Sequence, residues 1–336
     1  MAIVILTFAP LFAAPDVLAD ASDAVLEQGR QQVDEPSRQN PVLSQRGTGL
    51  EKGKTIQAET ATDDPASGTT AVAAEEIALE HGKINTADAS PVAPGHYEIE
   101  SSFSYTRATR FWDTSGHSHD RYPFQGENIG LFVTAGLFEN ADISVSGSYS
   151  WLRDDGNNFG GGTRVAEPIT EHDFTDTELR GRYRFYNNEH LEIAYMAGVS
   201  IPTGSNSDGD GISSSQKFWS FNQMLVATKD WQRLTLNGDI GFTLPIAGKK
   251  ENARGALNLD LAMGYHILPW LQAEVELNYS HNSMQNEDDA QTLAITAGLV
   301  MPVNETLRVN IGVQQDVWGE NTDKTMTTSA TVTLAF

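Results

Sequence analysis

Five charged residues occupy every second position of one short stretch of this sequence: Asp176, Glu178, Arg180, Arg182 and Arg184. Successive side chains of a β-strand point to opposite faces, so these five would share one face of a strand. Burying a charge without a partner or water is costly. The pattern therefore predicts an interior that is wet or ion-paired on this side of the strand.

Other charges share the same predicted interior face. Glu192 would lie opposite Arg184 across a tight turn, and Arg308 also points inward. The remaining acids of this set are Glu98, Glu100, Asp239, Asp260, Glu274, Glu276 and Asp316. In a ring of twelve strands, the arginine-bearing strand and the strand of Glu274 and Glu276 are five apart and face each other. Two interpretations stay open: a transverse field that orients solutes in a passage, or ion pairs that fill and close the lumen.

The end of the chain shows most clearly which elements hold these charges. Residues 325–336 alternate between an apolar face that ends at Phe336 and a face of Thr and Ser hydroxyls. A lipid-facing apolar side and a polar lumen side are typical of an outer-membrane barrel strand. The aromatic carboxy-terminus resembles the sorting signal that barrel-assembly machinery reads. Phe336 is therefore predicted to be that signal.

The sequence predicts an all-β fold, a twelve-stranded antiparallel transmembrane β-barrel over residues 95–336. The strands are expected to begin near Tyr97, Glu127, Ala141, Phe174, His190, Lys217, Leu234, Gly255, Leu271, Ala290, Leu307 and Lys324. Their connections alternate between short turns and longer polar loops, such as 113–125, 154–173 and 319–323. Short periplasmic turns and long external loops are typical of such barrels. Both ends of the barrel should then lie in the periplasm.

The six tryptophans fall near predicted strand ends and none falls in mid-strand. Trp231 and Trp270 lie at predicted periplasmic turns, and the other four are Trp112, Trp151, Trp219 and Trp318. Indole rings favour membrane interfaces. This placement favours a membrane barrel over a soluble sandwich.

The amino-terminal part has a different composition. Residues 1–20 are expected to be a secretory signal peptide, although a basic start is missing; the alternative is a buried strand or helix. Residues 21–94 contain no Phe, Tyr or Trp. Such a stretch cannot bury enough apolar surface to fold alone, so we expect a disordered, partly helical, acidic periplasmic segment. A plug docked in the lumen is the alternative.

Overall composition excludes several function classes. The chain has 336 residues, a formal charge of −23 and no cysteine. The negative charge argues against nucleic acid as a partner. The lack of cysteine removes disulfides and thiolate chemistry.

Three further motifs could carry chemistry. His281 and Ser283 have the His-x-Ser spacing of outer-membrane phospholipases, but no companion motif supplies an orienting group or an oxyanion hole. Residues 206–211 mimic the start of a calcium loop but lack its final carboxylate. His117 and His119 lack a third defined metal ligand. We therefore expect no catalytic residue, no metal and no cofactor.

Residues 176–185 (DTELRGRYRF) and 197–204 (AGVSIPTG) resemble the outer-membrane family associated with the meta-pathway of phenol degradation. The resemblance covers about residues 174–336. It implies a barrel transporter, often encoded near aromatic catabolism, without a catalytic signature.

Together these observations predict a protein of the cell outer membrane with its amino-terminal segment in the periplasm. Its expected function is passage of small molecules, and hydrophobic or aromatic compounds are implied by the resemblance alone. The expected partners are outer-membrane lipid and lipopolysaccharide, the barrel-assembly machinery and a small-molecule solute. The alternatives are a lipid hydrolase that uses His281 and Ser283, and a non-conducting structural or adhesive barrel.

Overall fold

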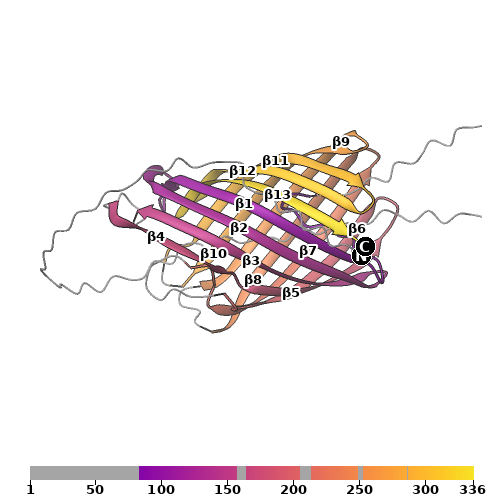
Figure 1. Cartoon of the computed structure of the whole chain (residues 1–336), viewed down its shortest axis with the longest axis horizontal. Coiled ribbons are helices and arrows are strands. Elements are labelled where there is room, and N and C mark those ends of the chain that lie inside the picture. The colour runs from indigo at the N-terminus through magenta and orange to yellow at the C-terminus, as the bar shows by residue number, and fades with distance from the viewer. Residues whose placement is uncertain (1–82, 157–163, 205–212, 249–252, 286) are drawn as a thin grey trace, which may run out of the picture. The chain divides into compact units, whose positions relative to one another are not determined.

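The computed structural model describes residues 83–156, 164–204, 213–248, 253–285 and 287–336, which form thirteen β-strands (Figure 1). These are β1 (Tyr97–Trp112), β2 (Ser118–Phe138), β3 (Ala141–Gly156), β4 (Arg164–Phe174), β5 (Thr177–Asn187), β6 (Leu191–Ile201), β7 (Phe218–Trp231), β8 (Leu234–Gly248), β9 (Ala253–Leu268), β10 (Leu271–Met284), β11 (Ala290–Asn304), β12 (Leu307–Glu320) and β13 (Thr322–Ala335). Within these ranges, no helix is long and apolar enough to cross a membrane.

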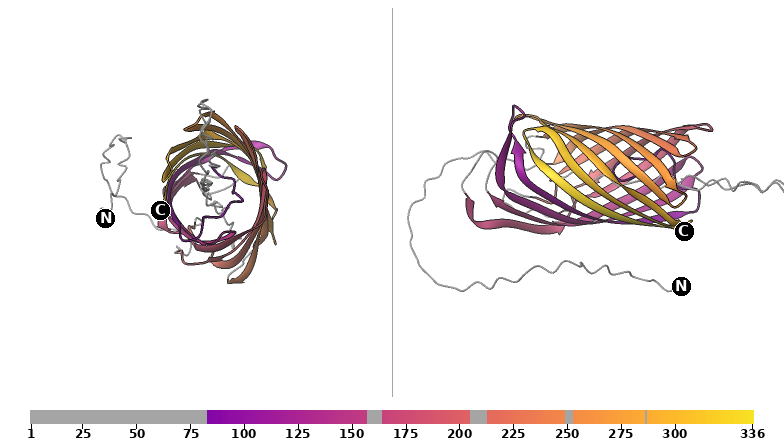
Figure 2. Two further views of the ribbon diagram at one scale, coloured as in Figure 1. Left: turned by 90° about the vertical axis from the view of Figure 1, so that its right-hand side faces the viewer. Right: turned by 90° about the horizontal axis from the view of Figure 1, so that it is seen from above.

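The strands form one closed antiparallel barrel. β1 pairs with β2 on one side and with β13 on the other, which closes the ring. β4 and β5 both pair with β3, in the registers Tyr149↔Phe174 and Ser146↔Glu178, so they share one place in the wall. Twelve positions around the ring result, and the predicted twelve-stranded barrel is confirmed (Figure 2).

The strands reach further on the loop side than the sequence pattern indicates. β2 begins at Ser118 rather than near Glu127, and β4 lies within the expected loop 154–173. The expected loop 319–323 is reduced to Asn321, whose φ of 50° makes a tight turn. The strict alternation of short and long connections is therefore wrong. Backbone pairing continues past the apolar band because polar strands pair as readily as apolar ones in water.

The two faces of the wall follow the predicted alternation. Large apolar side chains such as Leu261, Ile129 and Leu225 are exposed on the outer face, whereas the buried side chains are mostly polar. Five tryptophans are exposed: Trp219, Trp231, Trp270 and Trp318 lie at or near strand ends, whereas Trp151 lies within β3, five residues before its end. Trp112 differs, because it is buried at the end of β1 with the Lys324 ammonium 5.2 Å from its ring centroid. Trp112 therefore lies at a strand end as predicted, but its ring is buried and does not face a membrane interface.

Candidate functional site

The lumen contains part of the chain itself. Residues 83–93, here called the lumen strap, lie inside the ring before β1 (Figure 2). Ile84 N–H donates to Glu274 Oε1 and to Glu276 Oε1, both at 3.1 Å. Asn85 N–H and Thr86 N–H donate to Glu276 Oε1 at 2.9 and 3.2 Å. Two lumen carboxylates of β10 thus hold the first turn of the strap by its backbone.

The strap crosses towards β3 along further acceptors. Ala87 N–H donates to Asp239 Oδ2 of β8 at 3.2 Å, and Ala89 N–H donates to Thr228 Oγ1 of β7 at 3.1 Å. Val92 N–H donates to Asp142 Oδ2 of β3 at 2.9 Å. Hydrogen bonds to an ionised acceptor are stronger than neutral ones. The carboxylates of Asp239 and Asp142 therefore hold the strap backbone more strongly than a neutral acceptor would.

The arginines of β5 meet the opposite end of the strap. Arg182 Nη1 donates to the Asp88 carbonyl at 3.0 Å, and its Nε donates to Asp142 Oδ2 at 3.0 Å. Arg184 pairs with Glu192 at 3.0 Å, and Ser90 Oγ donates to the same carboxylate. The acids therefore receive strap N–H groups while an arginine donates to a strap carbonyl.

Small residues in the wall make room for the strap. A Cβ on Gly312 would lie 2.7 Å from Ile84 Cγ2, and one on Gly298 would lie 2.3 Å from Ile84 Cδ1. A Cβ on Gly136 would lie 1.9 Å from the Ala93 carbonyl oxygen. Further along, Ala87 and Ala89 pack in one apolar cluster with Ala194, Met196 and Val226. The wall is thus shaped for this segment.

All ten side chains named as pore-lining candidates lie on the lumen face. Arg180 pairs with Glu178 at 2.7 Å, and Asp260 accepts from Asn278 Nδ2 at 3.0 Å. Those that are buried at that face are Glu98, Glu100, Arg180, Arg182, Asp239, Asp260, Glu274 and Glu276. Arg184 and Glu192 keep 15% and 19% of their side chains accessible.

Sequence reasoning placed these charges but missed what lies between them. Lys83 to Ala93 belong to the stretch for which composition favours a tether, yet here the alternative, a segment docked in the lumen, holds. Residues 1–82, including the expected signal peptide, lie outside the described residues. The signals that could have found the strap are the lumen-facing glycines Gly136, Gly298 and Gly312, which leave the wall unfilled.

A vestibule lies on the loop side of the strap, with Ile84 and Asn85 among its lining residues. Its volume is about 380 Å³. Most of its lumen-facing lining is hydroxyl or amide, and a few apolar side chains join it: Phe124, Phe132, Leu152, Met196 and Met224. Polar walls with a few apolar contacts are suited to a small amphiphilic molecule.

A cluster of ion pairs joins β2, β3 and β13 near the loop end of the barrel. Arg121 of β2 pairs with Asp154 of β3 at 2.8 Å and with Asp323 of β13. All three residues fall in the loops expected from the sequence, 113–125, 154–173 and 319–323, and so outside the expected membrane-spanning segments. Burial opposes the charge of Arg121, but Asp323 and Asp154 outweigh burial and raise its pKa. Burial raises the pKa of Asp323, and Arg121 offsets part of that rise.

The histidines of the β1–β2 turn surround a carboxylate. His119 Nε2 lies 2.8 Å from Asp113 Oδ2, and His117 Nδ1 lies 3.7 Å from Asp113 Oδ1. The hydrogen bond with His119, and then that from His117 N–H, lower the pKa of Asp113 to about 2. In the described ranges, no three such side chains are placed to hold a metal ion. The calcium-like stretch 206–211 lies outside them.

The residues of the hydrolase alternative do not assemble. His281 Nε2 lies 3.3 Å from Asp289 Oδ2, which supplies the orienting carboxylate that the sequence did not reveal. Ser283 shares its strand, but no hydrogen bond joins it to His281 in the described part of the chain. A serine nucleophile needs that contact for activation.

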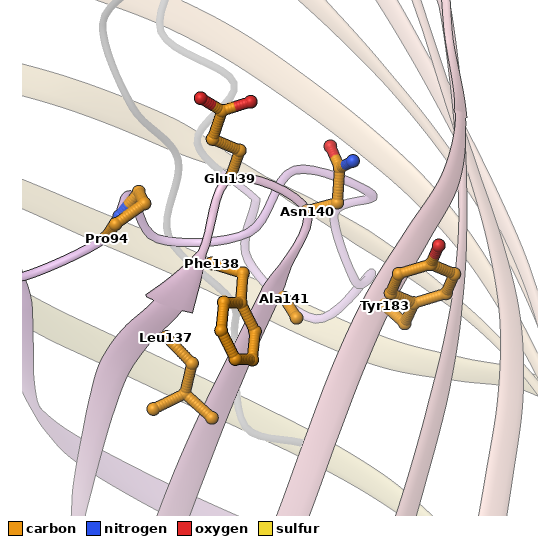
Figure 3. A pocket seen from close by; sticks show the side chains of 7 residues that line it. All are labelled: Pro94, Leu137, Phe138, Glu139, Asn140, Ala141 and Tyr183. Carbon is orange, nitrogen blue, oxygen red and sulfur yellow. The ribbon is translucent and has the colours of Figure 1, made fainter.

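A second pocket lies outside the lumen, at the end of the barrel that carries the β2–β3 turn. Pro94, Leu137, Phe138, Ala141 and Tyr183 line it with the β2–β3 turn, over about 670 Å³ (Figure 3). Leu137, Phe138 and Tyr183 are outer-face residues, exposed by about half or more. This hollow therefore belongs to the lipid-facing surface and not to a path through the barrel.

The family model described as "Putative MetA-pathway of phenol degradation" matches residues 81–332, about three quarters of the chain. The chain belongs to this family. The matched range begins just before the lumen strap and includes the strap and the barrel apart from its last residues. The resemblance noted in the sequence is thus confirmed.

One of the two solved structures compared below, the COG4313 channel, supports the family assignment at the level of the fold. The COG4313 outer membrane channel from Pseudomonas putida F1 has a TM-score of 0.64 at 11% identity, covering 76% of this chain and 100% of that one. NanC porin has a TM-score of 0.43 at 10% identity, covering 70% and 98%. No curated protein matches the sequence. This member of the phenol-degradation family therefore has the fold of an outer-membrane channel.

Proposed function

We propose that this barrel passes small molecules across the outer membrane and that the lumen strap holds it closed. The observation that carries the proposal is the strap itself, fastened between Glu276 on one wall and Arg182 on the other. Each fastening is a hydrogen bond or ion pair that water can replace, so the strap can leave without breaking the wall. The barrel pairing, which involves every strand, stays intact when it moves.

The nature of the fastenings supports the second interpretation of the lumen charges, in which they fill and close the lumen. Arg182 of β5 donates to the strap carbonyl of Asp88, and Glu276 of β10 accepts from the strap N–H of Asn85. The strap thus connects the two opposite walls. In the closed state these charges hold the strap and orient no solute. They face the passage only once the strap has moved.

A disulfide lock tests the proposal directly. The chain has no cysteine, so a pair introduced at Ala89 and Val226, which pack in one cluster, is the only thiol pair present. Oxidised protein should show fewer conducting events in planar bilayers than wild type, and reduction should restore them. The single-cysteine variants are the matched controls. Equal conductance of oxidised and reduced protein would refute the role of the strap.

The family description and the lining of the vestibule together suggest a class of cargo. The family description concerns phenol degradation, and the vestibule combines hydroxyl groups with side chains such as Phe132 and Met196. We propose aromatic or other hydrophobic small molecules. Uptake into proteoliposomes should be faster for phenol-sized aromatics than for sugars of similar mass, and the reverse order would exclude this cargo.

Targeting is proposed from the carboxy-terminus, with outer-membrane lipid and lipopolysaccharide as surroundings. Phe336 N–H donates to the Tyr97 carbonyl at 2.9 Å, so the last residue also belongs to the seam. Deleting Phe336 should leave synthesis unchanged but reduce assembly by the barrel-assembly machinery, as measured by heat-modifiable mobility. Replacing Phe336 with Tyr keeps an aromatic end and is the control.

A further inference from the structure

A guanidinium is buried at the periplasmic end of the lumen without a counter-ion. Arg308 is the second residue of β12 and only 2% of it is exposed. Its Nε, Nη1 and Nη2 atoms have no hydrogen-bond partner in the described part of the chain. The other lumen arginines described above, by contrast, all have carboxylate partners.

Arginine has no means of avoiding this situation by losing its charge. Its guanidinium stays protonated in proteins, unlike a buried lysine or histidine. An unpaired charge in a buried place is strongly unfavourable. Arg308 therefore calls for an anionic group that the described residues do not supply.

The neighbours of Arg308 are also polar and also lack partners. Thr333 of β13 is its register partner, and Asn310 lies two residues along on the same face. Both are 2% exposed, and neither Thr333 Oγ1 nor Asn310 Oδ1 has a partner in the described residues. On the other side, the register partner is Pro302, whose side chain has no acceptor for the guanidinium. Four donor atoms and one acceptor atom without partners among the described residues thus belong to neighbouring lumen-facing positions of β12 and β13.

The nearby acids are occupied elsewhere. Glu100 pairs in register with Thr333, one strand beyond it, and has an interaction of its own. Glu274 and Glu276 bind the strap N–H groups. Asn310 Nδ2 donates to the Lys83 carbonyl at 2.8 Å, which fixes its amide beside Arg308.

We propose that Arg308, Thr333 and Asn310 form a binding site for a small organic carboxylate. The planar guanidinium matches a carboxylate with two parallel hydrogen bonds, and the Thr333 hydroxyl adds a third donor. Asn310 Oδ1 accepts a hydroxyl next to the carboxylate, so a hydroxy acid fits better than a simple acid. This site does not depend on conduction, so it stands or falls separately from the proposed channel.

Saturation-transfer NMR on the full chain in detergent tests the site with acetate, glycolate and acetamide. Acetate should bind, glycolate should bind more tightly, and neutral acetamide should not compete. Arg308→Gln should weaken acetate by about tenfold or more, since a charge-assisted pair is lost. Arg107→Gln is the matched control, because Arg107 is exposed on the outer face. It should leave binding unchanged.

A second variant guards against misfolding. Thr333→Val keeps the shape of the side chain and removes one donor, so acetate should bind a few-fold more weakly while heat-modifiable mobility is unchanged. Acetamide binding as well as acetate, or equal acetate binding by wild type and Arg308→Gln, would overturn the proposal. Loss of the glycolate advantage in wild type would restrict the site to simple carboxylates and overturn the role of Asn310.

Discussion

Replacing Glu276 with alanine should release the first turn of the lumen strap. Glu276 accepts from the N–H groups of Ile84, Asn85 and Thr86. Ile84 N–H keeps Glu274 as an acceptor, so two donors lose their described partners in Glu276→Ala. At ~1–3 kcal/mol for each unsatisfied buried donor, and with water replacing part of the loss, we expect about 2–4 kcal/mol. That corresponds to a ~30- to 1000-fold larger detached population.

Amide hydrogen exchange of residues 84–86 in detergent measures this population. Protection should fall by the same factor, while amides of the β10–β11 ladder keep theirs. Glu127→Ala is the matched control, because Glu127 is exposed on the outer face of β2. Unchanged protection at residues 84–86 in Glu276→Ala would refute the reasoning, since the carboxylate would then hold nothing.

Three further predictions follow from particular positions. Gly136→Ala should displace the strap exit and speed exchange at residues 92–96, because its Cβ would lie 1.9 Å from a backbone oxygen; Gly147→Ala, whose nearest neighbour is 4.0 Å away, should not. Leu259→Arg, on the lipid face, should lower the free energy of folding into bilayers by ~2–4 kcal/mol in urea titrations, and full tolerance would mean that its side chain faces the lumen. The Asp113 carboxyl should titrate at about 2 by NMR and move towards its usual value in His119→Ala. Because folding lowers this pKa, its stabilisation of the turn is present above about pH 4 and is lost as the pH falls towards 2; an unshifted titration would exclude the hydrogen bond.

The wall of the barrel could be read from the sequence because its signal is a period of two. Arg182 and Glu276 fall on the lumen face because each side chain alternates with a lipid-facing one. The ends of the strands could be predicted less well from the sequence. β2 continues to Ser118 through polar residues, and nothing in the alternation marks where the membrane stops.

The strap could not be predicted because it is bound through groups that every residue carries. Ala87 and Ala89 are held by N–H groups, so their side chains leave no periodic or hydrophobic signature. The evidence for the strap lies instead in the wall, where glycine at position 312 leaves room for the Ile84 side chain. The His281–Asp289 contact was missed for another reason: it joins a strand to a loop, and loop geometry is not encoded by periodicity.

The seam between β1 and β13 gives assembly a fixed order. β1 follows the strap directly, whereas β13 is the last strand to be synthesised, so these two can pair only after all the others exist. Contacts between distant parts of a chain form slowly. The strap is made before any of its acceptors, and Asn310, which holds its first residue, is on the last strand but one. If the strap holds the channel closed, as proposed, a barrel that forms its seam around a strap already in place is closed from that moment, and the membrane is not exposed to an open pore during biogenesis.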